Sequence, residues 1–265
     1  MGPISKEPII QVVDVVQHYG VRPVLRKVSL DVVPHELLSI VGPNGMGKST
    51  LLGVISGALS PQSGHVVVDG LRRKETEERE LEIRRRIAWL PDHPWLPKER
   101  TGREFLLSVG GMYGVEPLRL FDHIDRLLDV FDLAKQGDWA IRSYSNGQQK
   151  KIAVCGALVS EAPILLLDEP FSGGLDPAGI LALKKVLRGL VERRRATIVM
   201  TSPVPEILEE LADRIVVLRE GNIVICDTPD AIKRTARTGG SLAEALARLM
   251  HPETVETVER YFEAD

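Results

Sequence analysis

Short apolar runs and segments of helical periodicity alternate along most of the chain. Runs rich in Val, Ile and Leu predict strands, because such side chains suit a buried pleated sheet. The expected strands are Ile9–Val16, Val24–Val33, Leu37–Val41, Val66–Asp69, Ile87–Leu90, Ile164–Leu167, Thr197–Met200 and Ile215–Leu218. The expected helices are Lys48–Ala58, Phe105–Gly114, His123–Phe131, Gly147–Val159 and Ala178–Arg193. This alternation favours an α/β fold with a mainly parallel sheet.

Three helical segments in succession interrupt the alternation. We expect them to form a helical subdomain at about 97–160, inserted into a domain that covers residues 1–228. Residues 229–265 form a C-terminal extension, in which Leu242, Leu246 and Leu249 fall on one stripe of a helix. Polar and acidic residues follow from His251 onward.

Composition and charge narrow the class of protein. Hydrophobic residues make up 43% of the 265 residues, which suits a sizeable buried core. The net charge of -3 argues against a strongly basic face, so no nucleic acid partner is expected. No apolar run approaches the roughly 20 residues that a membrane span needs. The two cysteines, Cys155 and Cys226, lie in apolar segments, and we expect reduced core thiols.

Residues 71–87 are dense in charges of both signs. Glu80 with Arg84, and Glu82 with Arg86, have the i,i+4 spacing that favours ion pairs along a helix. A solvated helical face is therefore expected here, without a chemical role.

Residues 42–50 read GPNGMGKST and lie between a predicted strand and a predicted helix. The pattern is typical of a P-loop, in which glycines let backbone N–H groups surround phosphate at a helix N-terminus. We expect Lys48 to reach the β- and γ-phosphates of ATP, Ser49 to bind Mg²⁺ and Thr50 to support the α-phosphate. The alternative is an ordinary glycine-rich turn. The predicted nucleotide-binding residues are Gly42, Pro43, Asn44, Gly45, Met46, Gly47, Lys48, Ser49 and Thr50.

Two carboxylates end the apolar run ILLLDEP at residues 164–170. An open α/β sheet places its site at the carboxyl ends of its strands. We expect Asp168 to hold Mg²⁺ through a bound water, and Glu169 to orient and deprotonate the water that attacks ATP. Glu169 and Lys48 are thus the predicted catalytic residues. The alternative is that both carboxylates only cap a helix.

The order of these motifs resembles the nucleotide-binding subunit of ATP-binding cassette (ABC) transporters over nearly the whole chain. The segment YSNGQ at residues 144–148 resembles the family signature LSGGQ, and GLDP at residues 174–177 resembles the loop after the acidic motif. Tyr19, in HYG, resembles the aromatic residue that stacks on adenine. Residues 90–107 resemble the linker that senses the γ-phosphate and touches the membrane subunit.

The resemblance implies a P-loop NTPase core with a mainly parallel sheet, an antiparallel β subdomain and an inserted helical subdomain. It implies that two subunits, in a homodimer or a heterodimer, sandwich two MgATP molecules head to tail. Each P-loop would then be completed by a partner's signature, which in this chain is Ser145, Asn146, Gly147 and Gln148. Asp176 would couple the two sites, or serve as a plain helix cap. The other implied partners are transmembrane permease subunits, with the chain on the cytoplasmic face of the membrane.

Three residues depart from the family pattern. Pro203 stands where the family has a histidine that donates to the γ-phosphate, and a group such as His93 could replace it. Asp92 stands where the family has a glutamine ligand, and its carboxylate could still bind magnesium or water. Asn146 replaces the first signature glycine and, because Asn tolerates positive φ, the phosphate nest can survive.

Several aromatic residues and histidines are further candidates for contacts or chemistry. Trp95, with Leu96, is the candidate contact for a membrane subunit, whereas Trp89 and Trp139 are expected in or at the edge of the core. The remaining histidines have no catalytic or metal-ligand spacing and are expected to be solvated. They are His18, His35, His65, His123 and His251.

The leading hypothesis is an ATPase subunit that powers transport through separate transmembrane subunits, with a preference for export. A second hypothesis is a regulatory ATP-binding module with marginal hydrolysis, because Pro203 offers no donor. A third is a soluble cassette ATPase that acts on ribosomes or DNA.

Overall fold

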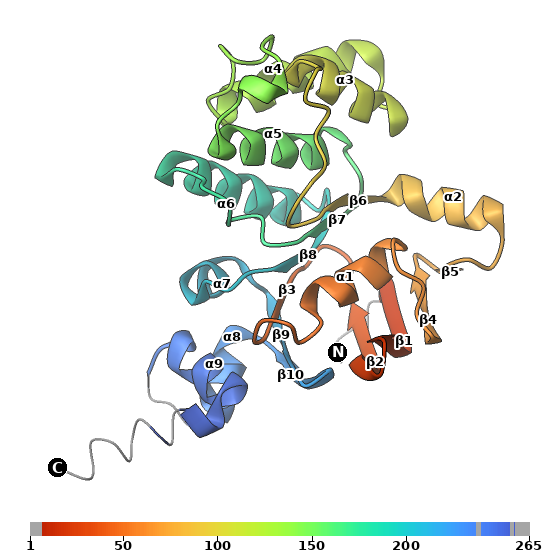
Figure 1. Ribbon diagram of the computed structural model, residues 1–265, viewed down its shortest axis with the longest axis vertical. Helices are drawn as coiled ribbons and strands as arrows, with labels where there is room; N and C mark the ends of the chain where they lie inside the picture. Colours follow the sequence, from red (N-terminus) through yellow and green to blue (C-terminus); the bar gives the residue numbers. More distant parts are fainter. Residues whose placement is uncertain (1–6, 237–239, 255–256, 258–265) are drawn as a thin grey trace, which may run out of the picture.

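A computed structural model describes residues 7–236, 240–254 and 257 of the chain. A six-stranded sheet runs through the middle of the molecule, a four-stranded sheet lies at one end of it, and a group of helices stands at the other (Figure 1). The α/β fold expected from the sequence is confirmed.

The six-stranded sheet has the order β10-β9-β3-β8-β7-β6. Five of its strands are parallel, and β10 pairs antiparallel with β9. The bounds are β3 Leu37–Val41, β6 Ile87–Leu90, β7 Ile164–Leu167, β8 Thr197–Thr201, β9 Arg214–Arg219 and β10 Asn222–Asp227. Because neighbouring parallel strands point the same way, the carboxyl ends of β3, β6, β7 and β8 meet at one edge of the sheet.

The four-stranded sheet is antiparallel, with the order β2-β1-β4-β5. Its strands are β1 Ile10–Tyr19, β2 Arg22–Val32, β4 Ser63–Val68 and β5 Leu71–Arg72. The first strand extends past its expected end at Val16, because β1 continues to Tyr19 and only Gly20 and Val21 turn the chain. The strand expected at Val66–Asp69 begins earlier, at Ser63.

The helices fall into three groups. Helices α3 Gly102–Met112, α4 Pro117–Val130 and α5 Asn146–Val159, with the 3-10 turn η1 Ile141–Ser143, pack on one another in the inserted segment. Helices α6 Pro177–Glu192, α7 Pro205–Leu211, α8 Pro229–Thr235 and α9 Leu242–Met250 follow the later strands. Helices α1 Lys48–Ser56 and α2 Glu77–Arg86 lie on the side of the antiparallel sheet.

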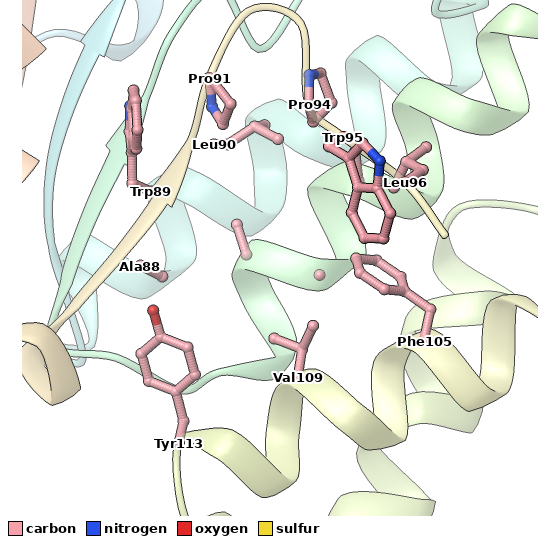
Figure 2. A pocket seen from close by; sticks show the side chains of 13 residues that line it. Ala88, Trp89, Leu90, Pro91, Pro94, Trp95, Leu96, Phe105, Val109 and Tyr113 are labelled. Atoms are coloured by element: carbon pink, nitrogen blue, oxygen red, sulfur yellow. The ribbon is translucent and has the colours of Figure 1, made fainter. Parts of the chain in front are cut away.

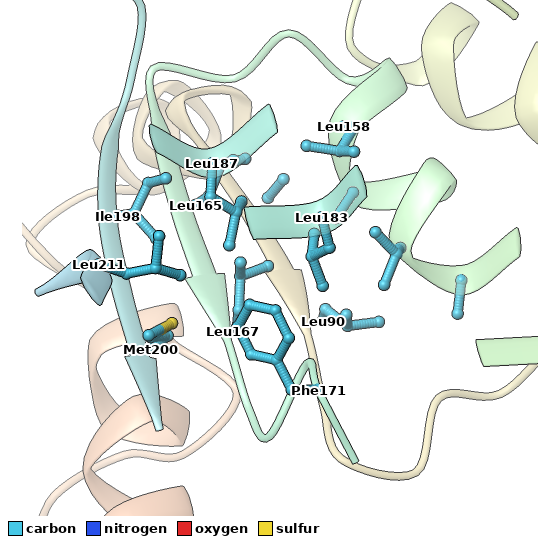
Figure 3. Close-up of a cluster of buried hydrophobic side chains, with 14 of the residues drawn as sticks. Leu90, Leu158, Leu165, Leu167, Phe171, Leu183, Leu187, Ile198, Met200 and Leu211 are labelled. Atoms are coloured by element: carbon cyan, nitrogen blue, oxygen red, sulfur yellow. The ribbon is translucent and has the colours of Figure 1, made fainter. Parts of the chain in front are cut away.

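Alternate residues of the six-stranded sheet enter two separate hydrophobic clusters. One face packs on α1 and the antiparallel sheet through Leu38, Ile40, Leu166, Val199 and Val216. The opposite face packs on α5, α6 and α7 through residues that include Leu165, Leu167, Ile198 and Met200 (Figure 3). A parallel sheet covered on both faces explains why its strands are apolar at nearly every position.

The charged stretch at residues 71–87 differs from the expectation. The two predicted i,i+4 ion pairs are present, from Arg84 to Glu80 (3.1 Å) and from Arg86 to Glu82 (2.6 Å). However, Glu80 is buried and pairs with buried Arg73 at 2.8 Å, and Arg73 also donates to the carbonyl oxygen of Ile55 at 2.7 Å. The prediction of a purely solvated face is therefore wrong, because Glu80 of α2 is connected through Arg73 to the end of α1.

Several single residues also differ from their predicted surroundings. Trp89 and Trp139 are exposed, at 37% and 52%, so the prediction of core or core-edge residues is wrong for both. Cys155 is buried, but Cys226 is only half-buried and accepts a hydrogen bond from Arg214 (2.8 Å).

Four of the five histidines expected to be solvated are instead half-buried, namely His18, His35, His65 and His123. The ring of His123 lies 3.3 Å from the Glu161 carboxylate. His251 is exposed, as expected.

The C-terminal helix joins the main core. Leu242 and Leu246 of α9 are buried in the same cluster as the sheet, and Leu249 packs against it, as the helical stripe predicts. The division at residue 228 remains a prediction. Most of the predicted acidic tail, at residues 255–256 and 258–265, lies outside the described residues. Within the described ranges, no helix has the length and apolar character to cross a membrane.

Candidate functional site

The P-loop connects β3 to α1 and is held closely on two sides. Gly47 has a φ of 99°, and a Cβ there would lie 2.8 Å from the carbonyl oxygen of Val24 in β2. A Cβ on Gly42 would lie 2.1 Å from the carbonyl oxygen of Leu218 in β9. Both positions therefore require glycine, as the P-loop pattern predicts.

The start of α1 is suited to an anion. Gly47 gives the helix no side-chain cap, and its first turn contains no acidic residue. The first backbone N–H groups of a helix have no partner within the helix, and the helix dipole favours negative charge there. Exposed Ser49 lies in the same turn.

Lys48 is buried within the P-loop. Its Nζ donates to the carbonyl oxygens of Gly42 (2.9 Å) and Pro43 (3.2 Å). Burial lowers the pKa of Lys48, and the nearby carboxylates of Glu169 and Asp168 oppose this shift. The ammonium and the two carboxylates are therefore within electrostatic reach of one another, as their predicted roles require.

The two carboxylates follow β7 and are fixed by Thr201 at the end of β8. The Asp168 side chain is buried, with the residue 3% exposed, and its Oδ1 accepts a hydrogen bond from Thr201 Oγ1 at 2.6 Å. The same Oγ1 accepts from the backbone N–H of Glu169 at 2.8 Å. Glu169 has a φ of 45°, in the left-handed region that costs free energy for a residue with a Cβ. One hydroxyl thus holds both acidic residues, and neither carboxylate caps a helix, since α6 begins at Pro177 with Asp176 as its cap.

The donor set fits a magnesium ion that is shared with phosphate. Magnesium prefers oxygen ligands and usually combines one or two protein groups with water and phosphate oxygens. The Ser49 hydroxyl and the Asp168 carboxylate are such oxygens, and the uncapped helix end would take the phosphates. Among the described residues, no three His, Cys, Asp or Glu side chains form a complete metal site by themselves.

The predicted signature residues form the start of α5. Ser145 is the N-cap, and a capping box joins it to Gln148, with Gln148 N–H to Ser145 Oγ at 3.3 Å and Ser145 N–H to Gln148 Oε1 at 2.9 Å. Asn146 is the first helical residue and does not adopt positive φ. The tolerance of Asn for positive φ is therefore not required at position 146, because the helix has already begun there, and the survival of the phosphate nest remains a prediction.

The loop that contains Asp176 packs against the signature helix. A Cβ on Gly147 would lie 2.6 Å from the carbonyl oxygen of Gly174, so glycine is required at this contact. Asp176 accepts from Lys151 Nζ at 2.9 Å and from the N–H of Gly179 at 2.6 Å. These two hydrogen bonds hold the pKa of Asp176 below its usual range. Asp176 therefore serves as a helix cap, and it also ties α6 to α5.

Two of the three departures from the family pattern, Asp92 and Pro203, follow strands of the six-stranded sheet at this edge. Asp92, two residues after β6, accepts from Ser172 Oγ at 3.4 Å and lies 3.1 Å from His93 Nδ1. The His93 ring is exposed and points its Nδ1 at Asp92. Pro203 is exposed and follows the buried Ser202 after the end of β8. The replacement of the family histidine by His93 remains a prediction.

Tyr19 is the last residue of β1, where the hairpin turns into β2, rather than a loop residue as expected. Its ring is 58% exposed. The following strand reaches the P-loop, because Val24 abuts Gly47. Tyr19 is thus an available stacking surface on the antiparallel sheet beside the P-loop.

Trp95 stands at an apolar groove between the β6 linker and the helical segment (Figure 2). The residue is 82% exposed, and the groove has a volume of about 270 Å³. Its walls come from the linker, from α3 and from α5, and include Leu96, Phe105, Val109 and Tyr113. An exposed aromatic side chain over such a groove is typical of an interaction site.

The predicted residues from three separate segments meet at one edge, namely Lys48, Asp168 with Glu169, and Asp92. The signature residues lie at the start of α5 and not at this edge. They contact the loop that follows Glu169, where Gly147 packs against Gly174. One residue of this edge was missed from the sequence, Thr201. Thr201 could have been found from the strand order, since β7 and β8 are neighbours with Leu167 opposite Met200.

Three features define an ATP-binding cassette fold. A P-loop lies at the start of α1, an acidic pair lies at the end of β7, two strands away from β3 in the sheet, and a helical segment is inserted between them in the sequence. Residues 25–172 match the family described as ABC transporter, and the chain belongs to this family.

Relatives and solved structures agree with this assignment. The chain is 33% identical over 232 residues to the daunorubicin resistance ATP-binding protein DrrA3 of Streptomyces coeruleorubidus. The matched region covers 88% of this chain and 71% of DrrA3. It is 34% identical to the methionine import ATP-binding protein MetN 2 of Paraburkholderia xenovorans, over 76% of this chain and 52% of that protein. The chain thus spans only about half the length of MetN 2.

A solved ATP-binding subunit of an ABC transporter superimposes with a TM-score of 0.82 at 30% identity, over 91% of this chain and 99% of that one. The ATP-binding cassette MJ0796, solved as a dimer in a post-hydrolysis state with ADP and Pi, shares the fold at 24% identity. Its TM-score is 0.75, over 83% of this chain and 98% of that one. The chain is therefore an ABC-type ATP-binding subunit with a P-loop NTPase fold.

Proposed function

We propose that this chain binds MgATP in its P-loop and hydrolyses it to power transport through separate transmembrane subunits. The observation that carries this proposal is the pair Asp168 and Glu169, which Thr201 holds within electrostatic reach of buried Lys48. Nucleotide binding alone would need only the Asp168 carboxylate. It would not need a second carboxylate, that of Glu169, on a residue whose backbone is held in the left-handed region.

Each group has a distinct part in the proposed reaction. Lys48 and the first N–H groups of α1 bind the β- and γ-phosphates, and Ser49 and Asp168 hold the magnesium ion. A bound magnesium ion would supply positive charge that offsets the phosphate charge. Glu169 accepts a proton from water as the water oxygen attacks the γ-phosphorus and the bond to the ADP oxygen breaks. Tyr19 stacks on adenine.

The P-loop of one subunit is half a site in this proposal. The start of α5, with Ser145, Asn146, Gly147 and Gln148, would face the γ-phosphate held by a second ATPase subunit. The Ser145 hydroxyl already accepts from Gln148 N–H, but a hydroxyl can also donate its proton to phosphate. Asp176 would couple the two sites, because it ties the signature helix to the loop after Glu169.

The transmembrane partner would dock on the groove under Trp95, and the chain would lie on the cytoplasmic face of the membrane. The linker after β6 lines the groove and also contains Asp92. Nucleotide bound at the sheet edge and a partner bound in the groove would therefore both contact this linker. Both import and export ATP-binding proteins occur among the relatives. The preference for export remains a sequence-based prediction.

Purification from its source membranes in mild detergent tests the partner proposed here. We expect a protein with several membrane spans to accompany the tagged chain. A second, different ATPase subunit in the sample would identify a heterodimer, and its absence a homodimer. Recovery of only ribosomes or nucleic acid would favour the soluble cassette ATPase instead.

Pro203 supports a second candidate function, a regulatory ATP-binding module. Proline at this position has no N–H or ring donor for the γ-phosphate, and the residue lies directly after the strand that fixes Asp168. ATP would then close a dimer without appreciable turnover. Steady-state ATPase rates distinguish the two, because a module of this kind turns over no faster than its Glu169→Gln variant.

A further inference from the structure

A pocket of about 790 Å³ lies between α4, α5 and α6, at the opposite edge of the sheet from the nucleotide residues. Its lining includes Ala162, which precedes β7, and Ala196, which directly precedes β8. These positions mark the amino ends of two parallel strands, whereas Asp168 and Glu169 follow the carboxyl end of β7. A strand of four residues separates the two edges by about 13 Å. The pocket is therefore distinct from the nucleotide site, and its size suits a small molecule.

One part of the pocket wall is apolar. Leu127 and Val130 come from α4, Leu158 from α5, and Val186 and Leu190 from α6. Leu127 and Leu158 are buried, whereas Val130 is 48% exposed. Three helices thus present apolar side chains to the same space, which favours a ligand with an apolar body.

The rest of the wall is mainly basic. Arg119 and Arg126 come from α4, and Arg195 lies in the loop between α6 and β8. Among the described residues that line the pocket, Glu161 is the only acid. It is already bound by Arg119, from Nη2 to Oε2 at 2.8 Å and from Nε to Oε1 at 3.2 Å. Two of the three arginines therefore face the pocket without this carboxylate.

Arg126 and Arg195 are exposed, and neither forms an ion pair within the part of the chain that the structure describes. Arg126 donates from Nε to the carbonyl oxygen of Asp122 at 3.1 Å, which leaves its terminal nitrogens available. The carboxylates of Asp122 and Asp129, its neighbours on α4, do not line the pocket. A guanidinium group without a protein carboxylate can bind the carboxylate of a ligand through charge-assisted hydrogen bonds.

His123, which also lines the pocket, responds to the same positive charge. Burial, and then the charges of Arg126 and Arg119, hold the pKa of His123 below its usual value, although Glu161 opposes them. The arginines thus disfavour a further positive charge at the pocket wall and favour an anion.

We propose that this pocket binds an amphipathic organic anion, namely a carboxylate carried on an apolar chain or ring. Arg126 and Arg195 balance the charge of the carboxylate, and the wall that includes Leu127, Leu158 and Leu190 takes the apolar part. Because Arg126 lies on α4 and Arg195 directly before the residues that lead into β8, the bound anion joins the inserted helical segment to the sheet. The site needs no nucleotide and does not rest on the proposed function.

Isothermal titration calorimetry of the full chain with short fatty acids, in the absence of nucleotide, tests the chemical class. We expect saturable binding whose affinity rises from hexanoate to octanoate to decanoate by about twofold or more per methylene group, because each methylene is removed from water. Octan-1-ol has the chain without the charge and should bind about tenfold more weakly than octanoate. The absence of saturable binding, equal affinity for hexanoate and decanoate, or equal affinity for octanoate and octan-1-ol overturns the proposal.

Variants at exposed positions place the binding in the pocket without a risk to the fold. Arg126→Gln and Arg195→Gln should each weaken decanoate binding by about fivefold or more. Val130→Glu adds a carboxylate to the wall and should weaken it by about tenfold or more. Exposed Arg193 does not line the pocket and provides the matched control, Arg193→Gln, which should bind like the parent chain. Equal losses in Arg193→Gln and Arg195→Gln would show attraction to the general surface charge and overturn the site.

Competition with MgATP separates this site from the nucleotide site. We expect MgATP to leave decanoate binding unchanged, because the two sites lie at opposite edges of the sheet. Displacement of decanoate by MgATP would place it in the P-loop and overturn the proposal. Failure of the chain to hydrolyse ATP contradicts the proposed function only, so the two failures are distinguishable.

Discussion

Thr201 illustrates how a single hydroxyl can organise two acidic residues. It donates to buried Asp168 and accepts from the N–H of Glu169, which is held with a positive φ. Without that hydroxyl, Asp168 loses a donor and a backbone N–H loses its acceptor in a region with little access to water. The position of the proposed base therefore depends on the neighbouring strand.

We expect Thr201→Val to lower the free energy of unfolding by about 1–3 kcal/mol, because it leaves buried polar groups unpaired. Turnover should fall by about 10- to 100-fold as Glu169 loses its position. Thr201→Ser keeps the hydroxyl and should retain most of both properties. Urea unfolding and steady-state ATPase assays measure the two effects, and equal behaviour of the Val and Ser variants would contradict this role.

Pro203 is the second residue with a direct consequence for rate. Pro203→His would add a ring N–H donor directly after β8, where the family places one. We expect ATP turnover to rise by about threefold or more, because donors aimed at a developing phosphate charge lower the barrier. Pro205→His, in the first turn of α7, is the matched control and should not raise the rate. A rate that is unchanged in Pro203→His would show that another group already fills this role.

Sequence reasoning at this scale found the groups with a recognisable motif and missed those that depend on tertiary contacts. The P-loop and the acidic pair have fixed spacing, so the chain itself reports them. Thr201 acquires its importance from strand order, because it is far in sequence from Asp168 and Glu169, which it contacts. The helical backbone of Asn146 was missed as well, because it depends on the residue at which α5 begins.

At the scale of elements, buried parallel strands were the most predictable. The bounds of β3, β6 and β7 agree with the apolar runs, because strands covered on both faces are apolar throughout. Strand β10 was missed because it is a half-exposed edge strand that pairs antiparallel with β9. Helix α7 was missed because its seven residues, which begin at Pro205, carry little periodicity. The ion pair between Arg73 and Glu80 could not be predicted, since it needs the tertiary contact of α2 with α1.

The packing of α4 against α5 contains a histidine with a pH-dependent consequence. Burial lowers the pKa of His123, Glu161 at 3.3 Å opposes this, and Arg126 and Arg119 lower the pKa further. Since the folded protein favours the neutral ring, its stability is full above the ordinary histidine pKa near 6.5 and decreases as the pH falls below it.

We therefore expect His123→Gln to lose less stability than the parent chain between pH 7.5 and pH 5.5. Urea unfolding at a series of pH values measures the difference. Exposed His251, at the end of α9, gives the control variant His251→Gln, whose pH dependence should match the parent. A steeper loss of stability in His123→Gln would contradict the neutral buried ring.

For the whole molecule, the Trp95 groove and the nucleotide edge lie on the same linker. Trp95 is exposed over an apolar groove, whereas Asp92 on the same segment contacts the loop after Glu169. Closure of a second subunit over ATP and movement of a membrane partner would thereby be linked through a short stretch of chain. This arrangement accounts for the proposed transport role without a membrane span among the described helices.

Trp95→Ala should reduce recovery of the membrane partner by about tenfold or more, because a buried aromatic anchor often dominates an interface. Trp139→Ala removes a different exposed tryptophan and should leave recovery unchanged. Quantitative mass spectrometry of the detergent-purified assemblies compares the two. Equal losses in both variants would argue that the groove is not the docking surface.

The most direct test of the account is the steady-state ATPase rate of the purified assembly, compared with the same assembly that carries Glu169→Gln. The account predicts Mg²⁺-dependent turnover that falls by about 10²-fold or more in the variant, while ATP still binds. If the two assemblies hydrolyse ATP at the same rate, Glu169 is not the base, and this chain does not power transport from its own P-loop.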